Sequence, residues 1–148
     1  MGRRPESVNS GVRGTAKLVE LPSIEDPRGC LSVAEVGGVL PFVPHRLYWM
    51  HSAERNTIRG GHAHRQLEQL IIAMFGAFEI EVDNGLQKRT FVLEHPQLGL
   101  LLYPILWRDI RQLTPSGTLA VLASHSYDEQ DYIREKDEFY IELTKLAL

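Results

Sequence analysis

Short apolar or alternating segments, each followed by turn-forming residues, recur at intervals of about ten residues along this chain. Examples are residues 70–74, 78–82, 89–93 and 119–123, and the Asp-Asn-Gly sequence at 83–85 is a hairpin turn between two of them. Strands at this spacing are typical of a β-sandwich or β-barrel. The predicted fold class is therefore all-β.

Helical signals are confined to the C-terminal end. Residues 128–134 begin with acidic side chains and end with Arg134, the charge order of a short helix, and residues 137–148 are compatible with either a strand or a helix. The sequence has no Gly-x-Gly-x-x-Gly motif and no phosphate-binding loop. These observations disfavour an α/β enzyme with a nucleotide cofactor.

The chain has 148 residues, the length of one domain. Residues 1–14 contain three arginines among Pro, Ser, Asn and Gly, with little to bury, so we expect a flexible N-terminal tail. Residues 15–148 are expected to form a single domain.

Charge and cysteine content limit the partners and the location. Sixteen Lys and Arg against nineteen Asp and Glu give a net charge of -3, which does not favour nucleic acid as a partner. Residues 70–75 form the longest apolar stretch, far short of the roughly 20 residues that cross a bilayer. With Cys30 as the single cysteine and no apolar leader, we expect a cytoplasmic protein without membrane contact.

The most informative motif is the pair His62 and His64, which follows two glycines. On an extended strand these two imidazoles share one face and can act on one cavity. The pair resembles the first motif of the cupin barrel, in which two His, a later carboxylate and a closing Gly supply metal ligands. As an isolated pattern, two surface histidines at this spacing are an equally good interpretation.

The rest of the sequence departs from a metal-binding cupin. Gln69 stands six residues before Gly76, where the motif has its carboxylate, and Arg108 stands where a second motif has another His. A guanidinium cannot ligate a metal. Glu68 would complete a three-ligand site only if the strand register shifted by one residue. We therefore predict a site without metal or other cofactor that performs acid/base chemistry.

A closer resemblance covers residues 18–140. The chain is similar to the sugar 3,4-ketoisomerases, small cupins that act on dTDP-4-keto-6-deoxyglucose. The matching strings are Asp26-x-Arg28-Gly29-x-Leu31-Ser32, Pro41-Phe42, Arg46-x-Tyr48, Arg59-Gly60-x-His62-Ala63-His64, Glu68-Gln69 and Leu122-Ala123-Ser124-x-x-Tyr127-Asp128-Glu129-x-Asp131-Tyr132-Ile133-Arg134. The resemblance implies a cupin-type jelly-roll barrel or sandwich and a dTDP-linked 4-keto-6-deoxysugar as substrate. Members often have His where Arg108 stands, which leaves the sugar and the regiochemistry open.

The chemistry of such an isomerase suggests roles for three residues. A base must remove the proton on C3, next to the keto group, and a proton must reach C4. His62 is our choice for this shuttle, because an imidazole exchanges protons near neutral pH. His64 is the second acid/base or orienting group, and Tyr48 offers a phenolic proton.

Five further residues are predicted to bind the substrate. Arg46 and Arg59 are suited to the diphosphate or the enediolate, although most arginines are simply solvated. Gln69, Trp107 and Arg108 complete the set, and for Trp107 core packing is the more frequent role. The acidic residues of 127–134 would repel a diphosphate, so this segment is expected to be a cap or a dimer contact.

Two alternatives and an oligomeric state complete the expectations. A 3,5-epimerase begins with the same proton abstraction at C3, and a non-catalytic sugar-nucleotide-binding cupin would use the same residues for binding alone. The paired imidazoles favour an enzyme. Because a short barrel exposes edge strands that a second copy can cover, we expect a homodimer. His45, His51, His95 and His125 have no partner pattern and are expected to be surface or structural residues.

Overall fold

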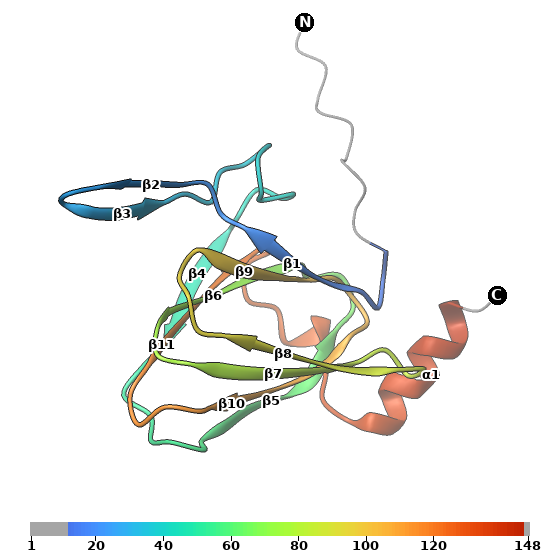
Figure 1. The fold of residues 1–148 in the computed structure, drawn as a ribbon. Helices are drawn as coiled ribbons and strands as arrows, with labels where there is room; N and C mark the ends of the chain where they lie inside the picture. Colours follow the sequence, from blue (N-terminus) through green and yellow to red (C-terminus); the bar gives the residue numbers. More distant parts are fainter. Residues whose placement is uncertain (1–11, 147–148) are drawn as a thin grey trace, which may run out of the picture.

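Two five-stranded antiparallel sheets face each other in the computed structural model, which describes residues 12–146 (Figure 1). The first sheet has the order β1-β9-β6-β11-β4 and the second the order β12-β5-β10-β7-β8. The strands of the first sheet are β1 (Ala16–Glu20), β4 (Arg46–Met50), β6 (Gln69–Phe75), β9 (Leu98–Leu102) and β11 (Thr118–Ala123). Those of the second are β5 (Ile58–His64), β7 (Phe78–Asp83), β8 (Lys88–Leu93), β10 (Trp107–Gln112) and β12 (Tyr132–Ile133). The predicted all-β, cupin-type sandwich is confirmed.

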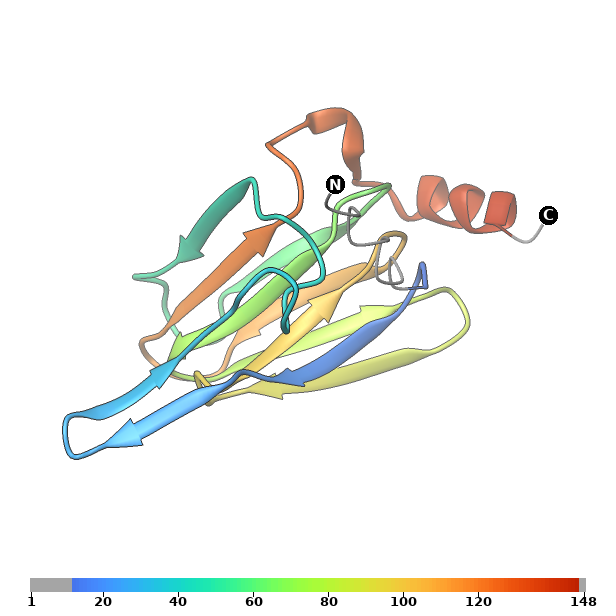
Figure 2. The same ribbon diagram turned by 90° about the horizontal axis from the view of Figure 1, so that it is seen from above.

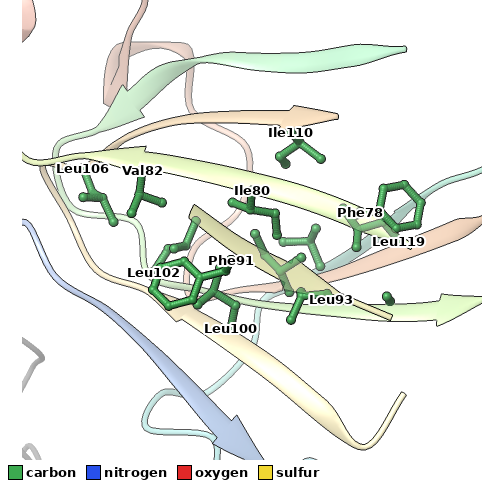
Figure 3. Packing of buried hydrophobic residues seen from close by; sticks show 13 residues of the cluster. Phe78, Ile80, Val82, Phe91, Leu93, Leu100, Leu102, Leu106, Ile110 and Leu119 are labelled. Atoms are coloured by element: carbon green, nitrogen blue, oxygen red, sulfur yellow. The ribbon is translucent and has the colours of Figure 1, made fainter. Parts of the chain in front are cut away.

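The main hydrophobic core lies between the two sheets (Figure 3). Strand β7 shows how alternation builds it, because Phe78, Ile80 and Val82 are buried while Glu79 and Glu81 remain partly exposed. The core cluster consists of Ile71, Ala73, Phe78, Ile80, Val82, Phe91, Leu93, Leu100, Leu102, Leu106, Ile110, Leu119 and Val121. Both sheets supply these side chains. The core therefore fixes the distance between the two sheets and the position of any site that lies between the sheets.

A long hairpin formed by β2 (Ser23–Asp26) and β3 (Gly29–Ser32) projects away from the sandwich (Figures 1 and 2). The reversal expected at 26–29 is confirmed: the backbone amide of Arg28 donates to Asp26 Oδ1 at 2.8 Å, and Gly29 has a φ of 123°. Ile24 and Leu31 pair across the hairpin and are both exposed.

The C-terminal region combines a 3-10 turn, η1 (Glu129–Asp131), with strand β12 and helix α1 (Lys136–Leu146). The short helix expected in residues 128–134 is present only as this three-residue 3-10 turn, after which the chain pairs with β5. Helical structure near the C-terminus is nevertheless confirmed by α1, which buries Phe139. No helix among the described residues is long and apolar enough to cross a membrane.

Two further segments bear on the sequence predictions. Strand β10 was not predicted, because Arg108, Asp109 and Arg111 interrupt its apolar pattern.

Most of the tail predicted for residues 1–14 lies outside the described residues. Gly14, at its end, donates a backbone hydrogen bond to the Pro104 carbonyl at 2.7 Å.

Candidate active site

A cavity of about 550 Å³ opens between the two sheets and contains six of the eight predicted site residues. The first sheet contributes β4, β6 and β11 to its walls, and the second contributes β5, β10 and β12. The predicted residues that line it are Arg46, Tyr48, Arg59, His62, Gln69 and Arg108. Side chains from four strands, β4, β5, β6 and β10, therefore meet at one place.

Pairing of β5 with β10 sets His62 directly across from Arg108. The register shifts between Arg108 and Asp109, and Gly60 opposite this irregularity has a φ of 96°. A Cβ at Gly60 would lie 2.7 Å from the Arg108 carbonyl oxygen, so the close approach of the two strands requires glycine here. The glycines before the His pair thus shape the backbone that presents His62.

His64 is buried behind the cavity wall and is held by an acid. Its Nδ1 lies 3.0 Å from Asp131 Oδ2, and its Nε2 has no hydrogen-bond partner within residues 12–146. Pairing of β12 with β5 places Tyr132 beside His64, with 4.5 Å between the ring centroids. The His62 and His64 rings meet edge to face at 4.8 Å. His62 therefore faces the cavity, and His64 packs against the side of His62 that is away from the cavity.

Both imidazoles are neutral at physiological pH. Burial, together with the positive charge of Arg108 and the neighbouring His64, lowers the pKa of His62 to about 3. Burial also lowers the pKa of His64 to about 4, although the hydrogen bond that His64 donates to Asp131 opposes this shift. A neutral imidazole has a free lone pair, which a general base needs.

Asp131 is ionised and well anchored. Burial opposes its ionisation, but the hydrogen bonds from His64 and from the backbone amide of Gln66 outweigh this and lower the pKa of Asp131. An ionised Asp131 accepts a hydrogen bond from the Nδ1–H of His64, so Nε2 of the neutral imidazole carries no proton. The pair fixes both the tautomer and the orientation of His64.

Tyr48 keeps its proton and is connected to the opposite sheet. Burial raises the pKa of the Tyr48 phenol, so it is a proton donor at neutral pH. Gln69 Nε2 donates to the Tyr48 hydroxyl at 2.8 Å, and Arg108 donates to Gln69 Oε1. These three residues connect β4, β6 and β10 beside the cavity.

Several arginines give the cavity positive charge. In the part of the chain that the structure describes, Arg46, Arg59 and Arg108 form no salt bridge with a carboxylate. Burial lowers the pKa of Arg108 to about 10, which still leaves it charged at neutral pH. Arg134 also lines the cavity and stacks over the Tyr132 ring at 4.3 Å, but it pairs with Glu129 at 2.6 Å. Such a surface is suited to an anion.

Trp107 lies outside this cavity, which corrects its prediction as a substrate-binding residue. Its side chain packs with Ile133 and Phe139 in a separate cluster under α1, and Lys136 lies 4.7 Å over the indole. Trp107 precedes Arg108 on β10, so alternation sends the two side chains to opposite faces. We therefore leave Trp107 out of the proposed site.

Sequence reasoning also missed positions of the candidate site. Asp131, Tyr132 and Arg134 belong to the segment expected to be a cap or dimer contact, yet Tyr132 and Arg134 line the cavity and Asp131 holds His64. Their only signal was the family-specific string itself. His51, expected to be a surface or structural residue, also contributes to the lining.

The cupin ligand positions are not all occupied by residues that bind a metal. Arg108 and Gln69 occupy two of these positions, and Glu68 does not line the cavity. Across residues 12–146, no group of three or more His, Cys, Asp or Glu side chains is arranged to hold a metal ion.

Comparison with known proteins agrees with this geometry. The family model described as FdtA, WxcM-like, C-terminal, matches residues 14–144. A TDP-4-oxo-6-deoxy-α-D-glucose-3,4-oxoisomerase of Aneurinibacillus thermoaerophilus is 33% identical over 132 residues, which cover 89% of this chain and 95% of that protein. The sugar 3,4-ketoisomerase QdtA of Thermoanaerobacterium thermosaccharolyticum, solved with TDP, has a TM-score of 0.85 at 32% identity and covers 90% of this chain and 97% of its own.

A third relative shares the fold at lower similarity. The dTDP-4-dehydrorhamnose 3,5-epimerase of Bacillus anthracis has a TM-score of 0.71 at 22% identity, and the match covers 79% of this chain and 76% of that protein. The family match over residues 14–144 and the isomerase relatives, at 32% and 33% identity, are more specific. This chain belongs to the sugar 3,4-ketoisomerase family of cupins, and it is an enzyme of that class.

Proposed function

We propose that this enzyme moves the keto group between C4 and C3 of dTDP-4-keto-6-deoxyglucose without a metal or other cofactor. The observation that carries the proposal is the meeting of neutral His62, protonated Tyr48 and guanidinium groups that have no carboxylate partner within residues 12–146 in one cavity. A 3-keto product is the form that an aminotransferase needs to build a 3-amino sugar. We place the enzyme in the cytoplasm, in such a biosynthetic route.

The first step is removal of the C3 proton by His62. The C4 carbonyl acidifies this proton, and its loss gives an enediolate whose negative charge develops next to Arg108. In the free protein the pKa of His62 is about 3, too low for an efficient base. A bound diphosphate brings negative charge beside the same guanidinium groups, which raises the pKa of His62 toward neutral pH.

The second step delivers a proton to C4. Protonated His62 returns the proton to C4, while Tyr48 donates to the oxygen on C4 as that carbonyl becomes a hydroxyl. The hydroxyl on C3 loses its proton and becomes the new carbonyl, and this proton replaces the one given by Tyr48. No net oxidation takes place, so the step balances without a redox partner.

The arginines at the cavity hold the nucleotide. Arg46 and Arg59 carry charge that no acid of the described residues neutralises, and a guanidinium binds phosphate oxygens through two N–H groups. Tyr132, stacked under Arg134, offers a ring at the same rim.

We also propose that the enzyme is a homodimer. The hairpin β2–β3 leaves Ile24 and Leu31 exposed, and a two-stranded hairpin without further packing is only marginally stable. Leu47 and Trp49 are exposed on the outer side of β4, an edge strand of the first sheet. Sedimentation equilibrium tests this state, and a monomer at micromolar concentration would contradict it.

The deciding experiment is incubation with dTDP-4-keto-6-deoxyglucose in deuterated water, followed by NMR. We expect a new 3-keto product with deuterium at C4, and deuterium at C3 of the recovered 4-keto substrate. Deuterium at C3 and C5 with inversion would identify a 3,5-epimerase instead, and binding without any exchange would identify a non-catalytic cupin.

A further inference from the structure

Arg108, Gln69 and Tyr48 form a hydrogen-bonded chain that joins the two sheets beside the cavity. Arg108 Nη1 donates to Gln69 Oε1, and Gln69 Nε2 donates to the Tyr48 hydroxyl at 2.8 Å. Arg108 is 1% exposed and Gln69 is 2% exposed, so water does not compete for these bonds. The order of donors and acceptors along the chain is therefore set by the side chains themselves.

Arg108 determines which way the Gln69 amide faces. A guanidinium has five donors and no acceptor, so the Gln69 atom next to it must be the carbonyl oxygen. Arg108 is itself fixed, because its Nε and Nη2 donate to the Leu106 carbonyl at 3.2 and 3.0 Å. The amide NH₂ of Gln69 consequently faces the Tyr48 oxygen, which is its hydrogen-bond partner in the part of the chain that the structure describes.

The direction of this bond controls the Tyr48 proton. The NH₂ group of Gln69 can only donate, so the phenolic oxygen is the acceptor and its own O–H must point elsewhere. Tyr48 lines the cavity, where a bound sugar supplies oxygen atoms. If the amide were reversed, Tyr48 would donate its proton to Gln69 and have none to offer a ligand.

We propose that Gln69, oriented by Arg108, is a positioning residue that keeps the Tyr48 hydroxyl proton directed at the oxygen on C4 of the sugar. The identity of that acceptor rests on the proposed function, whereas the direction of the hydrogen bond does not. The role differs from the direct substrate contact expected for Gln69 and Arg108. The proposal also explains what the buried Arg108 does: it has no acidic partner among the described residues, and it orients Gln69.

A double-mutant cycle tests this role. Gln69→Glu keeps the shape of the side chain but replaces the donor with a second acceptor, which draws the Tyr48 proton away from the sugar. We expect kcat to fall at least ~30-fold, the scale of general acid catalysis. In the Tyr48→Phe background no hydroxyl remains to misdirect. The factor by which Gln69→Glu lowers kcat should therefore be at least ten times smaller there than in the wild-type background. An equal loss in both backgrounds would overturn the proposal.

The added charge of Glu is controlled within this cycle, because it is present in both backgrounds. Circular dichroism and thermal melting verify that each variant is folded. If Gln69→Glu does not fold, Gln69→Met takes its place in the same cycle, where the Tyr48 hydroxyl loses its fixed direction and kcat should again fall more than in the Tyr48→Phe background. Gln69→Met also removes the donor, and it adds no charge.

NMR of the Gln69 side-chain amide measures the direction of the hydrogen bond between Gln69 and Tyr48 in the absence of substrate. The Gln69 NH₂ protons, assigned by their absence in Gln69→Met, should show cross-relaxation to the Tyr48 ring and move upfield in Tyr48→Phe. Cross-relaxation to the Arg108 guanidinium instead would overturn the inference. If the NMR result is as expected but the wild-type enzyme shows no isomerisation, the proposed function fails and the hydrogen-bond direction stands.

Discussion

Nδ1 of His64 lies 3.0 Å from Oδ2 of Asp131, across 67 positions of sequence. This bond couples the His-x-His strand to the segment that follows β11, and it holds His64 directly behind His62. An anchored imidazole behind a reactive one limits the rotation of both rings. The His pair therefore works as one unit with two different environments.

The first prediction concerns this bond. Asp131→Asn keeps the shape but removes the charge that fixes the His64 tautomer, so kcat should fall about 10- to 100-fold. ¹⁵N NMR of the imidazoles should show the mixed tautomers of His64 at the same time. Asp128→Asn is the matched control, because Asp128 only caps η1 and Asn caps equally well. Equal losses in both variants would contradict the role of Asp131.

The second prediction concerns the base. His62→Asn keeps a polar side chain but cannot accept a proton near neutral pH, so isomerisation and C3 exchange in deuterated water should both disappear. Binding of dTDP should persist, which calorimetry measures. His95→Asn, at an exposed position next to Glu94, serves as the control. Full C3 exchange in His62→Asn would transfer the role of base to His64.

The third prediction concerns nucleotide binding. Arg59→Ala should weaken dTDP affinity about tenfold or more, because it removes charge-assisted hydrogen bonds to the diphosphate. KM should rise while kcat changes little if this contact is equal in ground and transition states. Arg111→Ala is the matched control, since Arg111 lies on the neighbouring strand, pairs with Glu79 at 3.1 Å and does not line the cavity. Unchanged affinity in Arg59→Ala would exclude a diphosphate contact.

The sequence predicted the strands whose pattern is simple. Residues 78–82 alternate cleanly and correspond to β7, and Tyr48 and Arg46 share the inward face of β4 as expected from a period of two. Leu47 and Trp49 are accordingly exposed on the other face. Local alternation suffices for such strands, because burial on one side determines both the pattern and the face.

The sequence could not predict what depends on pairing between distant strands. Strand β10 has a buried Arg108 that is stabilised by Gln69 and the Leu106 carbonyl, and no local pattern shows such partners. Asp131 looked like part of a solvated acidic segment until β12 paired with β5 and brought it to His64. Charged residues at a site satisfy long-range contacts, so their roles become visible only in the folded chain.

The fourth prediction concerns metal. Arg108 and Gln69 occupy two cupin ligand positions, and Arg108 donates a hydrogen bond to Gln69. Because this pair does not hold a metal ion, exhaustive dialysis against a chelator should leave kcat unchanged. Elemental analysis before and after dialysis accompanies the assay. Stoichiometric zinc, manganese or iron that is lost together with turnover, and restores it when added back, would show that the site is metal-dependent.

The last prediction concerns acid stability. His62 and His64 have pKa values of about 3 and about 4 in the folded protein, against 6.5 ordinarily. Above pH 6.5 both imidazoles are neutral in the folded and unfolded states, and they add no pH dependence. Below it the unfolded chain binds more protons, so the free energy of unfolding should fall as the pH drops from 6.5 toward 4.

Each imidazole can change the free energy of unfolding by at most about 1.4 kcal/mol per pH unit. The contribution of His62 should be the smaller one, because its partial exposure lets water screen the charge. Urea unfolding at a series of pH values measures this slope. In His62→Asn it should shrink and the remaining slope should come mainly from His64, which is fully buried. His95→Asn, whose imidazole is largely exposed, should retain the wild-type slope. A slope that is the same in wild type and in His62→Asn would mean that His62 is not desolvated in the folded protein.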